Sequence, residues 1–323
     1  MTERQPTADG VAAAATRLAD HVTKTPLLPV EWEGKPLWVK AECLQWGGSF
    51  KLRGATNRLL LLSEEERRRG VVAFSSGNHA QGVAIAARRL GIEATIVMPS
   101  DAPAVKRDAT LAAGARIVEH DRHSQSREEI GARIAAETGA ILVPSFDDID
   151  IIEGQGSAGL EIADQIGGAP DQVVIPCGGG GLSAGVALAL PDSKIVIVEP
   201  EGWDDMGRSL AAGEIVEVPA DAPPTRCDAL QTRRVSPLTL DVLRARNATG
   251  VAVSEAETAI AVAFAARHLR LVVEPGGAVA LAALLAGKAG PISERSVILL
   301  SGGNIDPEVY AEILQSAAAR TVR

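Results

Sequence analysis

Residues 173–199, VVIPCGGGGLSAGVALALPDSKIVIVE, decide the fold class of this chain. An apolar β-branched run over 173–175 leads into four glycines, a small-residue stretch over 182–190 and a second β-branched run over 195–198. Because neither run alternates with polar residues, both are typical of strands that are buried on the two faces of a parallel sheet. The segment therefore predicts a strand–helix–strand unit of an α/β fold.

The same alternation extends along the rest of the chain and predicts parallel sheets with helices on both faces. We expect strands over 37–41, 71–74, 94–97, 116–118, 173–175, 195–198 and 297–300. We expect helices over 11–21, 53–62, 78–90, 104–113, 127–138, 155–166, 182–190, 255–268, 278–285 and 307–318. Ser254 and Glu257 have the spacing of a capping box at the start of one of these helices.

The length of 323 residues is sufficient for two domains. No fixed-period repeat or low-complexity tract interrupts the α/β pattern. The turn region at 143–145 predicts a small domain over 48–143, inserted into a large domain that consists of 1–47 and 144–323.

Composition and charge exclude several classes of function. The chain carries 32 basic and 41 acidic residues, a net charge of −9, and only 3% aromatic residues, so we expect no nucleic-acid partner. No stretch reaches the roughly 18 apolar residues of a membrane helix, and residues 1–20 show no signal-type apolar run. Three widely spaced cysteines fit neither a disulfide framework nor a zinc site. The expectation is a cytoplasmic enzyme that acts on a small molecule, without a membrane partner.

The four glycines at 178–181 predict an anion site. Glycines between a strand and a helix let backbone N–H groups close on an anion in front of the helix dipole. Gly179, Gly181 and Ala184 also match G-x-G-x-x-A, and Glu199 follows Gly179 by twenty residues, where a ribose-binding acid of a dinucleotide site belongs. This segment alone leaves open a phosphate-bearing cofactor and a nicotinamide dinucleotide.

Two further segments carry candidate chemistry. Lys51 lies between Phe50 and Leu52 at a loop-to-helix junction, where desolvation would lower its pKa as a Schiff-base lysine requires. The segment 75–79, Ser-Ser-Gly-Asn-His, follows a predicted strand and offers hydroxyl, amide and N–H groups at a helix N-terminus. Such groups form a cradle for a carboxylate.

Together these motifs resemble the serine/threonine dehydratase family, which includes serine racemases. They occur in the family's order as Ser49-Phe50-Lys51-Leu52-Arg53-Gly54-Ala55, Ser75 to Gly82, Gly178 to Gly181, and Ser301-Gly302-Gly303-Asn304. The resemblance spans residues 24–304 and implies a pyridoxal-phosphate (PLP) enzyme of the tryptophan-synthase-β-like fold, also called fold type II. It implies two open twisted α/β domains with the cofactor between them, and a homodimer, since relatives are commonly dimers.

The resemblance also implies how the cofactor would be held. Lys51 would form the Schiff base and take the substrate α-proton, Phe50 would pack beside the ring, and Asn78 would bind the phenolic oxygen. The phosphate would be held by backbone N–H groups of Gly178, Gly179, Gly180, Gly181 and Leu182. Ser301 would face the pyridine nitrogen, a neutral contact that makes the ring a weaker electron sink and suits β-elimination. Glu274 would stand near the ring.

The implied substrate site lies beside the cofactor. The substrate carboxylate would be bound by Ser75, Ser76, Gly77 and His79. Ser76 occupies the place that carries the acid in racemases of this family, on the ring face opposite the lysine. Arg127 and Thr232 resemble positions on the substrate side, where they could accept a second carboxylate.

The implied reaction is the elimination of water and ammonia from a small β-hydroxy amino acid, such as L-threonine or L-serine, to give a 2-oxo acid. Hydroxyaspartate dehydratase and serine racemase are alternatives on the same scaffold. A nicotinamide-dependent oxidoreductase and a catalytically silent amino-acid-binding protein are the alternatives from other classes.

The segment from Glu199 to Asp205 resembles the family's divalent-cation loop. Glu199 and Asp205 would supply carboxylates and Trp203 its carbonyl to Mg²⁺ or Ca²⁺, with water completing an oxygen shell. The family usually has a small residue at the position of Trp203, so this residue is a departure from its pattern.

Overall fold

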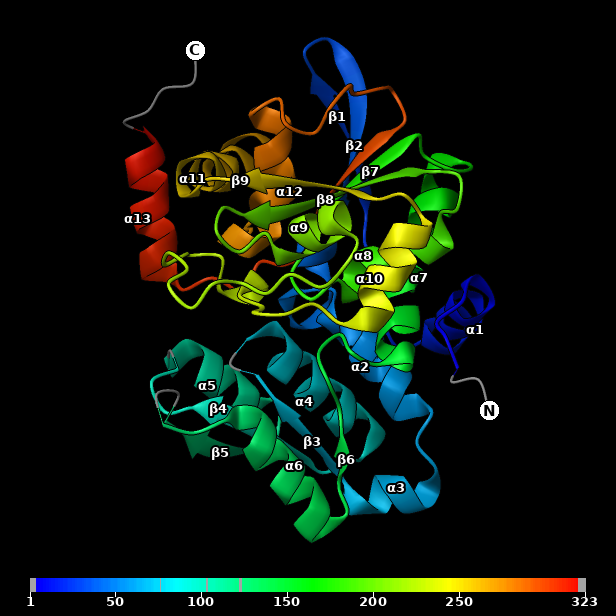
Figure 1. Cartoon of the computed structure of the whole chain (residues 1–323), viewed down its shortest axis with the longest axis vertical. Helices are drawn as coiled ribbons and strands as arrows, with labels where there is room; N and C mark the ends of the chain where they lie inside the picture. Colours follow the sequence, from blue (N-terminus) through cyan, green and yellow to red (C-terminus); the bar gives the residue numbers. More distant parts are fainter. Residues whose placement is uncertain (1–3, 76, 103, 122–123, 319–323) are drawn as a thin grey trace.

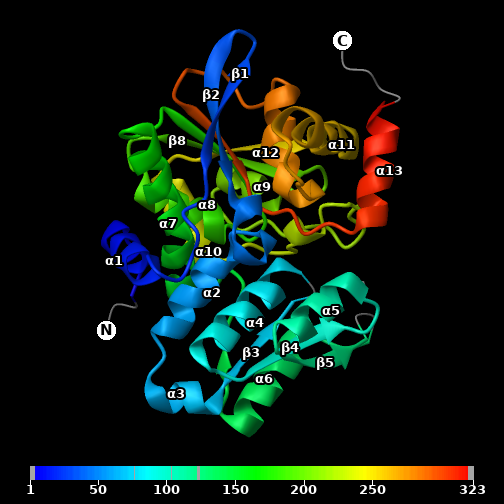
Figure 2. The same cartoon turned by 180° about the vertical axis from the view of Figure 1, so that it is seen from behind.

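The computed structural model describes residues 4–75, 77–102, 104–121 and 124–318. Two sheets, each covered by helices, form a larger and a smaller lobe that meet at a waist (Figure 1). The α/β class with parallel sheets is as predicted. Viewed from behind, the antiparallel hairpin of β1 (Leu27–Trp32) and β2 (Lys35–Ala41) projects from the end of the large lobe away from the waist (Figure 2).

The large lobe contains a six-stranded sheet in the order β1-β2-β10-β7-β8-β9. Only the β1–β2 pair is antiparallel, and the other neighbouring strands are parallel. Its strands are β1 (Leu27–Trp32), β2 (Lys35–Ala41), β7 (Gln172–Pro176), β8 (Lys194–Pro200), β9 (Thr249–Val253) and β10 (Ser296–Leu300). Every residue of β7 and β10 is buried, which explains the apolar runs that follow the polar first residue of each strand.

The small lobe contains a four-stranded parallel sheet in the order β5-β4-β3-β6. Its strands are β3 (Val71–Phe74), β4 (Ala94–Pro99), β5 (Arg116–His120) and β6 (Ile141–Leu142). The helices of this part of the chain are α2 (Lys51–Leu60), α3 (Glu64–Arg69), α4 (Asn78–Leu90), α5 (Ala104–Ala112) and α6 (Arg127–Thr138). The predicted domain boundaries at residues 48 and 143 stay a prediction, although all four strands lie between them.

The remaining helices belong to the large lobe. They are α1 (Ala8–Leu18), α7 (Ile149–Ile166), α8 (Gly181–Ala189), α9 (Asp205–Ala212), α10 (Pro237–Ala245), α11 (Glu255–Phe264), the π-helix η4 (Ala265–Leu269), α12 (Pro275–Leu285) and α13 (Pro307–Ala318). Short 3-10 turns are η1 (Glu42–Leu44), η2 (Trp46–Gly48) and η3 (Asp228–Leu230). The predicted capping box of Ser254 and Glu257 is present at the start of α11.

Three strands, β1, β6 and β9, were not predicted, because they are short or contain Pro29 or Gly250 and lack a continuous β-branched run. The predicted start of the helix at residue 155 is wrong by six residues, since the Asp148 side chain caps α7 by accepting the N–H of Ile151 (2.9 Å). Tertiary contacts and a cap therefore decided these boundaries.

Helix α2 connects the two lobes, because it packs on α4 in the small lobe and on α7 in the large lobe. The α2–α7 contact is close: a Cβ on Gly154 would lie 2.7 Å from the Cα of Gly54. A buried ion cluster also holds α2, where Arg53 pairs with Glu42 (2.7 Å) and with Glu161 of α7 (2.7 Å). Helix α2 is thus held by backbone packing and by charge at the point where the two lobes meet.

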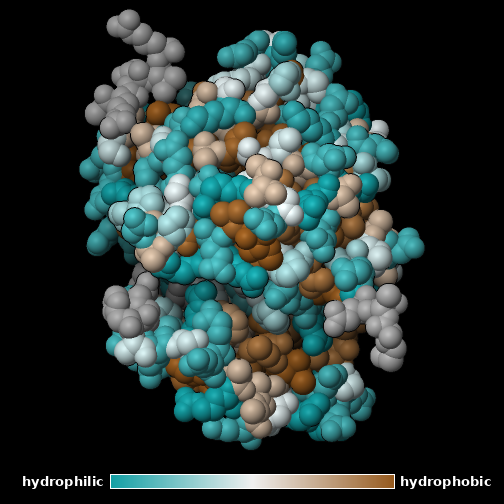
Figure 3. Space-filling model, in the orientation of Figure 1, coloured by the Kyte–Doolittle hydropathy of each residue, from teal (hydrophilic) through white to brown (hydrophobic). Residues whose placement is uncertain are grey.

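Hydrophobic residues gather near this waist on the face shown in Figure 3. No helix in the described ranges is both long and apolar enough to cross a membrane.

Candidate active site

Lys51 is the first residue of α2, at the waist. Its Nζ donates a hydrogen bond to the carbonyl oxygen of Ser145 (2.8 Å) and lies 5.2 Å from the centre of the Phe50 ring. Desolvation by the surrounding protein lowers the pKa of Lys51 to about 8. About a tenth of the amine is therefore neutral at pH 7, roughly 300-fold more than for a solvated lysine. Such an amine can act as a nucleophile or as a base at neutral pH.

The side-chain amide of Asn78, at the start of α4, is held from both sides. Its Nδ2 donates to Oε1 of Glu274 (2.6 Å), and its Oδ1 accepts from Nδ2 of Asn304 (2.8 Å). Burial, and secondarily the charge of Asp228, raises the pKa of Glu274 to about 8. The Glu274 carboxyl is thus mostly protonated at pH 7, and the Asn78 amide has a fixed orientation.

The segment after β10 lies between the Lys51 loop and Glu274. The N–H of Phe50 donates to the carbonyl oxygen of Ser301 (3.2 Å), and Ser49 forms an isolated bridge with Gly302. A Cβ on Gly302 would lie 2.1 Å from Oε1 of Glu274, so only glycine fits there. Ser301, which is buried, is thereby placed in the same site as Phe50.

The four glycines form the turn between β7 and α8, as predicted. Gly180 has a left-handed backbone (φ 87°). Gly181 and Leu182 begin α8, whose first N–H groups have no acceptor inside the helix. A Cβ on Gly179 would lie 2.4 Å from the Phe146 ring. The turn therefore needs glycine for packing, because Phe146 covers it closely.

The predicted carboxylate loop is at the carboxyl end of β3. The Ser75 hydroxyl oxygen accepts the N–H of Gly77 (3.2 Å). His79 Nε2 donates to the carbonyl oxygen of Val143 (2.9 Å), and its buried Nδ1 has no partner in the described chain. Desolvation lowers the pKa of His79 to about 3, so the ring is neutral. Ser76 lies outside the described residues.

The two residues predicted for a second carboxylate differ in position. Arg127 is half exposed, pairs with Glu128 (2.9 Å) and lies 5.7 Å from the centre of the Phe74 ring. Thr232, in contrast, faces the glycine turn, since its Oγ1 would lie 3.2 Å from a Cβ on Gly178. The structure brings Thr232 to the site wall and leaves Arg127 at the rim.

The candidate cation loop lies at the end of β8. Glu199 accepts the N–H groups of Met206 (3.0 Å) and Gly207 (2.7 Å) through its two oxygens. Both carboxylate oxygens of Asp205 are buried without a partner in the described chain. Burial raises the pKa of Asp205 to about 7, and burial together with the charge of Asp205 raises that of Glu199 well above its usual range. Trp203 is buried in the turn between them. Within the described residues, this loop included, no group of three or more His, Cys, Asp or Glu side chains could hold a metal ion.

Several residues of the site were not predicted from the sequence. Ser145 and Phe146 contact Lys51 and the glycine turn, and Asn304 holds Asn78. Lys106 on α5 pairs with Asp228 on η3. Only Asn304 had a sequence signal, because it ends a quoted motif. The others lie in ordinary loop or helix sequence.

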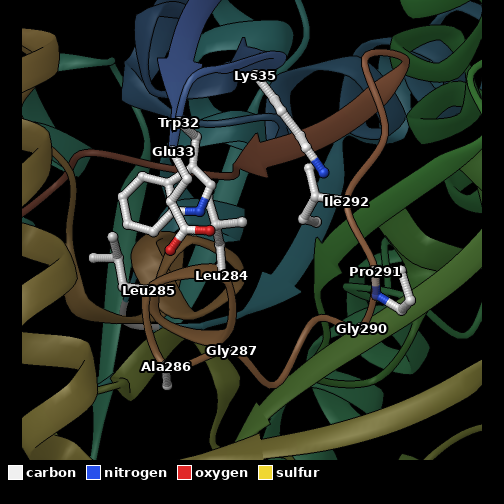
Figure 4. A pocket seen from close by; sticks show the side chains of 10 residues that line it. All are labelled: Trp32, Glu33, Lys35, Leu284, Leu285, Ala286, Gly287, Gly290, Pro291 and Ile292. Carbon is white, nitrogen blue, oxygen red and sulfur yellow. The ribbon is translucent and has the colours of Figure 1, made fainter.

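A separate surface pocket of about 500 Å³ lies beside the β1–β2 hairpin (Figure 4). It contains none of the predicted site residues. Its lining consists of Trp32, Glu33, Lys35, Leu284, Leu285, Ala286, Gly287, Gly290, Pro291 and Ile292.

The contacts above join the glycine turn, Glu274, Asn78, Ser301 and Lys51 into one site between the lobes. The residues present fit PLP: a desolvated amine could bind an aldehyde, a helix N-terminus could bind a phosphate, and a fixed amide could bind a ring oxygen. The fold and the site are those expected of an enzyme that uses a lysine amine beside a glycine-rich turn.

Comparison with known proteins identifies the family. Residues 18–302 match the family described as pyridoxal-phosphate dependent enzyme, and the chain belongs to it. The chain is 39% identical over 317 residues to the L-threo-3-hydroxyaspartate ammonia-lyase of Saccharomyces cerevisiae, covering 96% of each chain.

Two solved structures are similar throughout. Maize serine racemase has a TM-score of 0.90 at 35% identity, covering 98% of this chain and 99% of that one. The processed form of threonine deaminase isoform 2 from Solanum lycopersicum has a TM-score of 0.88 at 32% identity, covering 97% of this chain and 96% of that one.

These likenesses confirm the predicted family, fold type II and the class of PLP-dependent lyase acting on small hydroxy amino acids. The nicotinamide alternative is wrong. The family match overturns it, and the structure shows Glu199 accepting the N–H groups of Met206 and Gly207 at the start of α9 instead.

Proposed function

We propose that the residues assembled around Lys51 carry out β-elimination on a small 3-hydroxy amino acid. The net reaction releases ammonia and leaves a 2-oxo acid, because the water lost in the elimination is returned in hydrolysis. The single observation that carries this proposal is the desolvated Lys51 amine, placed beside the loop that would bind the substrate carboxylate. Bound PLP supplies an electron sink for the negative charge that develops at the substrate Cα.

The protein's own groups have distinct tasks in this proposal. Lys51 Nζ accepts the α-proton, for which a pKa near neutrality is suitable. Asn78 and Ser301 orient the cofactor ring, Phe50 packs beside it, and the protonated Glu274 keeps the Asn78 amide in place. The N–H groups of the glycine turn bind the cofactor phosphate.

The substrate carboxylate would bind to the segment Ser75–His79. Ser75 and Gly77 offer a hydroxyl and backbone N–H groups at the N-terminus of α4. The neutral His79 avoids an excess positive charge beside Lys51, whose own charge contributes to the low pKa of His79. Ser76 is proposed, by resemblance, as the group on the opposite ring face.

A substrate panel tests this function. We expect 2-oxo acid and ammonia from at least one of L-threonine, L-serine, D-serine and the 3-hydroxyaspartate isomers, measured by coupled reduction of the oxo acid. Chiral chromatography of the remaining substrate measures racemisation in the same samples. Bound PLP without 2-oxo acid from any of these compounds would contradict the proposal and favour a silent amino-acid-binding protein.

We further propose that Glu199, Asp205 and the Trp203 carbonyl bind Mg²⁺ or Ca²⁺. The supporting observation is that both side-chain oxygens of Asp205 are buried without a partner in the described chain. Asp205 is also close enough to Glu199 for the charge of Asp205 to raise the pKa of Glu199. Oxygen ligands of this kind suit hard divalent cations.

Removal of the cation tests this site. We expect millimolar Ca²⁺ or Mg²⁺ to raise the Tm of the EDTA-treated protein by about 5 °C, because the cation binds only the folded chain. Asp205→Asn should abolish the rise, whereas Asp204→Asn, a neighbouring and more exposed control, should retain it. Scanning calorimetry measures the Tm of the three proteins. An equal rise in Tm in all three would show that the ion does not bind at Asp205.

A homodimer and a cytoplasmic location are proposals as well. The homodimer is supported by the exposed apolar side chains of Leu44, Trp46 and Val272. Leu44 and Val272 lie in the same region of the surface, because Val272 and Cys43, the neighbour of Leu44, both lie close to Gly303. Three buried, free cysteines support a reducing compartment.

A further inference from the structure

Lys106 lies on the substrate side of the site. It is in the first turn of α5, which follows β4, and β4 pairs in parallel with β3. Neighbouring parallel strands end at the same edge of a sheet, so the start of α5 borders the loop 75–79 that follows β3. A cation at this position is therefore beside the proposed carboxylate loop.

The Lys106 ammonium group reaches across the waist to the large lobe. It pairs with the carboxylate of Asp228, which is 122 residues away in the chain. Asp228 begins η3, and the Cα of Leu230 in the same turn would lie 3.3 Å from a Cβ on Gly178. The Lys106–Asp228 pair thus links the small lobe to the segment of the large lobe that packs against the glycine turn.

Electrostatics also place this pair at the site. The charge of Asp228 raises the pKa of Glu274, and the charge of Lys106 lowers it. Glu274 is the carboxyl that holds the Asn78 amide. Both members of the pair therefore act on a group that is in contact with the proposed cofactor ligands.

The two partners differ in their access to water. The Lys106 side chain is only 15% exposed, whereas that of Asp228 is 46% exposed. Asp228 can be released to solvent at low cost, because a half-exposed carboxylate is readily hydrated and an exposed ion pair contributes little. Lys106 has a flexible stem and can exchange one carboxylate for another with a small movement.

The other cationic groups described here are not suited to a second substrate carboxylate. His79 is neutral, and Lys51 serves as the base in the proposed function. Arg127 is half exposed and pairs with Glu128. Of these groups, Lys106 is the charged and largely buried one that has no task in the proposed reaction.

We propose that Lys106 is the specificity residue for a dicarboxylic 3-hydroxy amino acid and binds its side-chain carboxylate, with Asp228 holding the ammonium group until the substrate replaces it. The inference rests on the proposed function and names the substrate class as 3-hydroxyaspartate. Substrates with one carboxylate, such as serine and threonine, leave the Lys106–Asp228 pair intact.

Steady-state kinetics of the holoenzyme on two substrates test the proposal. Lys106→Met, which keeps the length of the side chain, should raise KM for 3-hydroxyaspartate about 10- to 100-fold, as loss of a hydrogen bond to a charged group does. Its kcat/KM for L-serine should stay within about threefold of the parent value. Asp228→Asn removes the competing carboxylate and should lower KM for 3-hydroxyaspartate relative to KM for L-serine.

Two controls and a binding measurement complete the test. Lys24→Met, at an exposed pair with Asp164, should behave as the parent. Succinate should raise the Tm of the parent holoenzyme but not that of Lys106→Met, and butyrate should raise neither. The inference is overturned if Lys106→Met and the parent have equal KM for 3-hydroxyaspartate. It is also overturned if Lys106→Met and Asp228→Asn each impair the reactions of both substrates equally. A KM for 3-hydroxyaspartate that rises in Arg127→Met and in no other variant would overturn it as well. Failure of the proposed function is distinct, since the parent would then yield no 2-oxo acid from any substrate.

Discussion

Lys51→Ala is expected to retain less than about 10⁻⁴ of the parent kcat/KM on every 3-hydroxy amino acid that the parent converts. Two functions are lost together, because the same amine is proposed to bind the cofactor covalently and to accept the α-proton. No other described amine replaces it. Lys106 pairs with Asp228, Lys24 lies in an exposed ion pair with Asp164, and Lys35 lines the separate pocket beside the β1–β2 hairpin.

The measurement is the rate of 2-oxo acid formation by PLP-saturated protein, together with the visible absorbance of the covalently bound cofactor. The variant should lose that absorbance while its Tm stays within a few degrees of the parent value, because removal of a desolvated amine imposes no new buried charge. Lys24→Ala is the matched lysine control and should keep full activity. Residual activity of Lys51→Ala above about 1% of the parent value would show that another group is the base.

Arg53→Met is expected to lower the free energy of unfolding by about 3–5 kcal/mol. Arg53 is fully buried and donates to both oxygens of Glu42 (2.7 and 2.8 Å) and of Glu161 (2.7 and 2.8 Å). Methionine fills a similar volume but carries no charge. The carboxylates of Glu42 and Glu161 then keep only one cationic neighbour, Lys40, which pairs with Glu161 (2.6 Å). Uncompensated buried charge, rather than lost packing, is the physical cause.

Urea denaturation followed by circular dichroism measures this effect. Lys24→Met breaks an exposed pair with Asp164 and should leave the urea midpoint close to that of the parent, because exposed ion pairs contribute little. Arg53→Met combined with Glu42→Gln should recover part of the loss, since it removes one of the orphaned charges. The explanation fails if Arg53→Met costs no more than Lys24→Met, or if the double variant is less stable than Arg53→Met alone.

Much of the site could be predicted because parallel strands place their following loops together. The glycine turn and the segment 301–304 follow β7 and β10, which are neighbouring parallel strands of one sheet and end at the same edge. The segment 75–79 follows β3 of the other sheet, and the packing of the two lobes brings it to them. The resemblance then gave Lys51 its role. The short β6 and the edge strand β9 lacked such a run and were not predicted.

The sequence by itself determined the α/β class, the family and the segments that line the site, since these depend on local composition and on motifs a few residues long. Only the tertiary structure decided which charges lie in the site. Lys51 owes its low pKa to burial and meets a carbonyl 94 residues away, Lys106 meets Asp228 across 122 residues, and Arg127 turns to its neighbour Glu128. Desolvation and ion pairing depend on distance in space and on access to water, and neither is encoded in the spacing of residues along the chain.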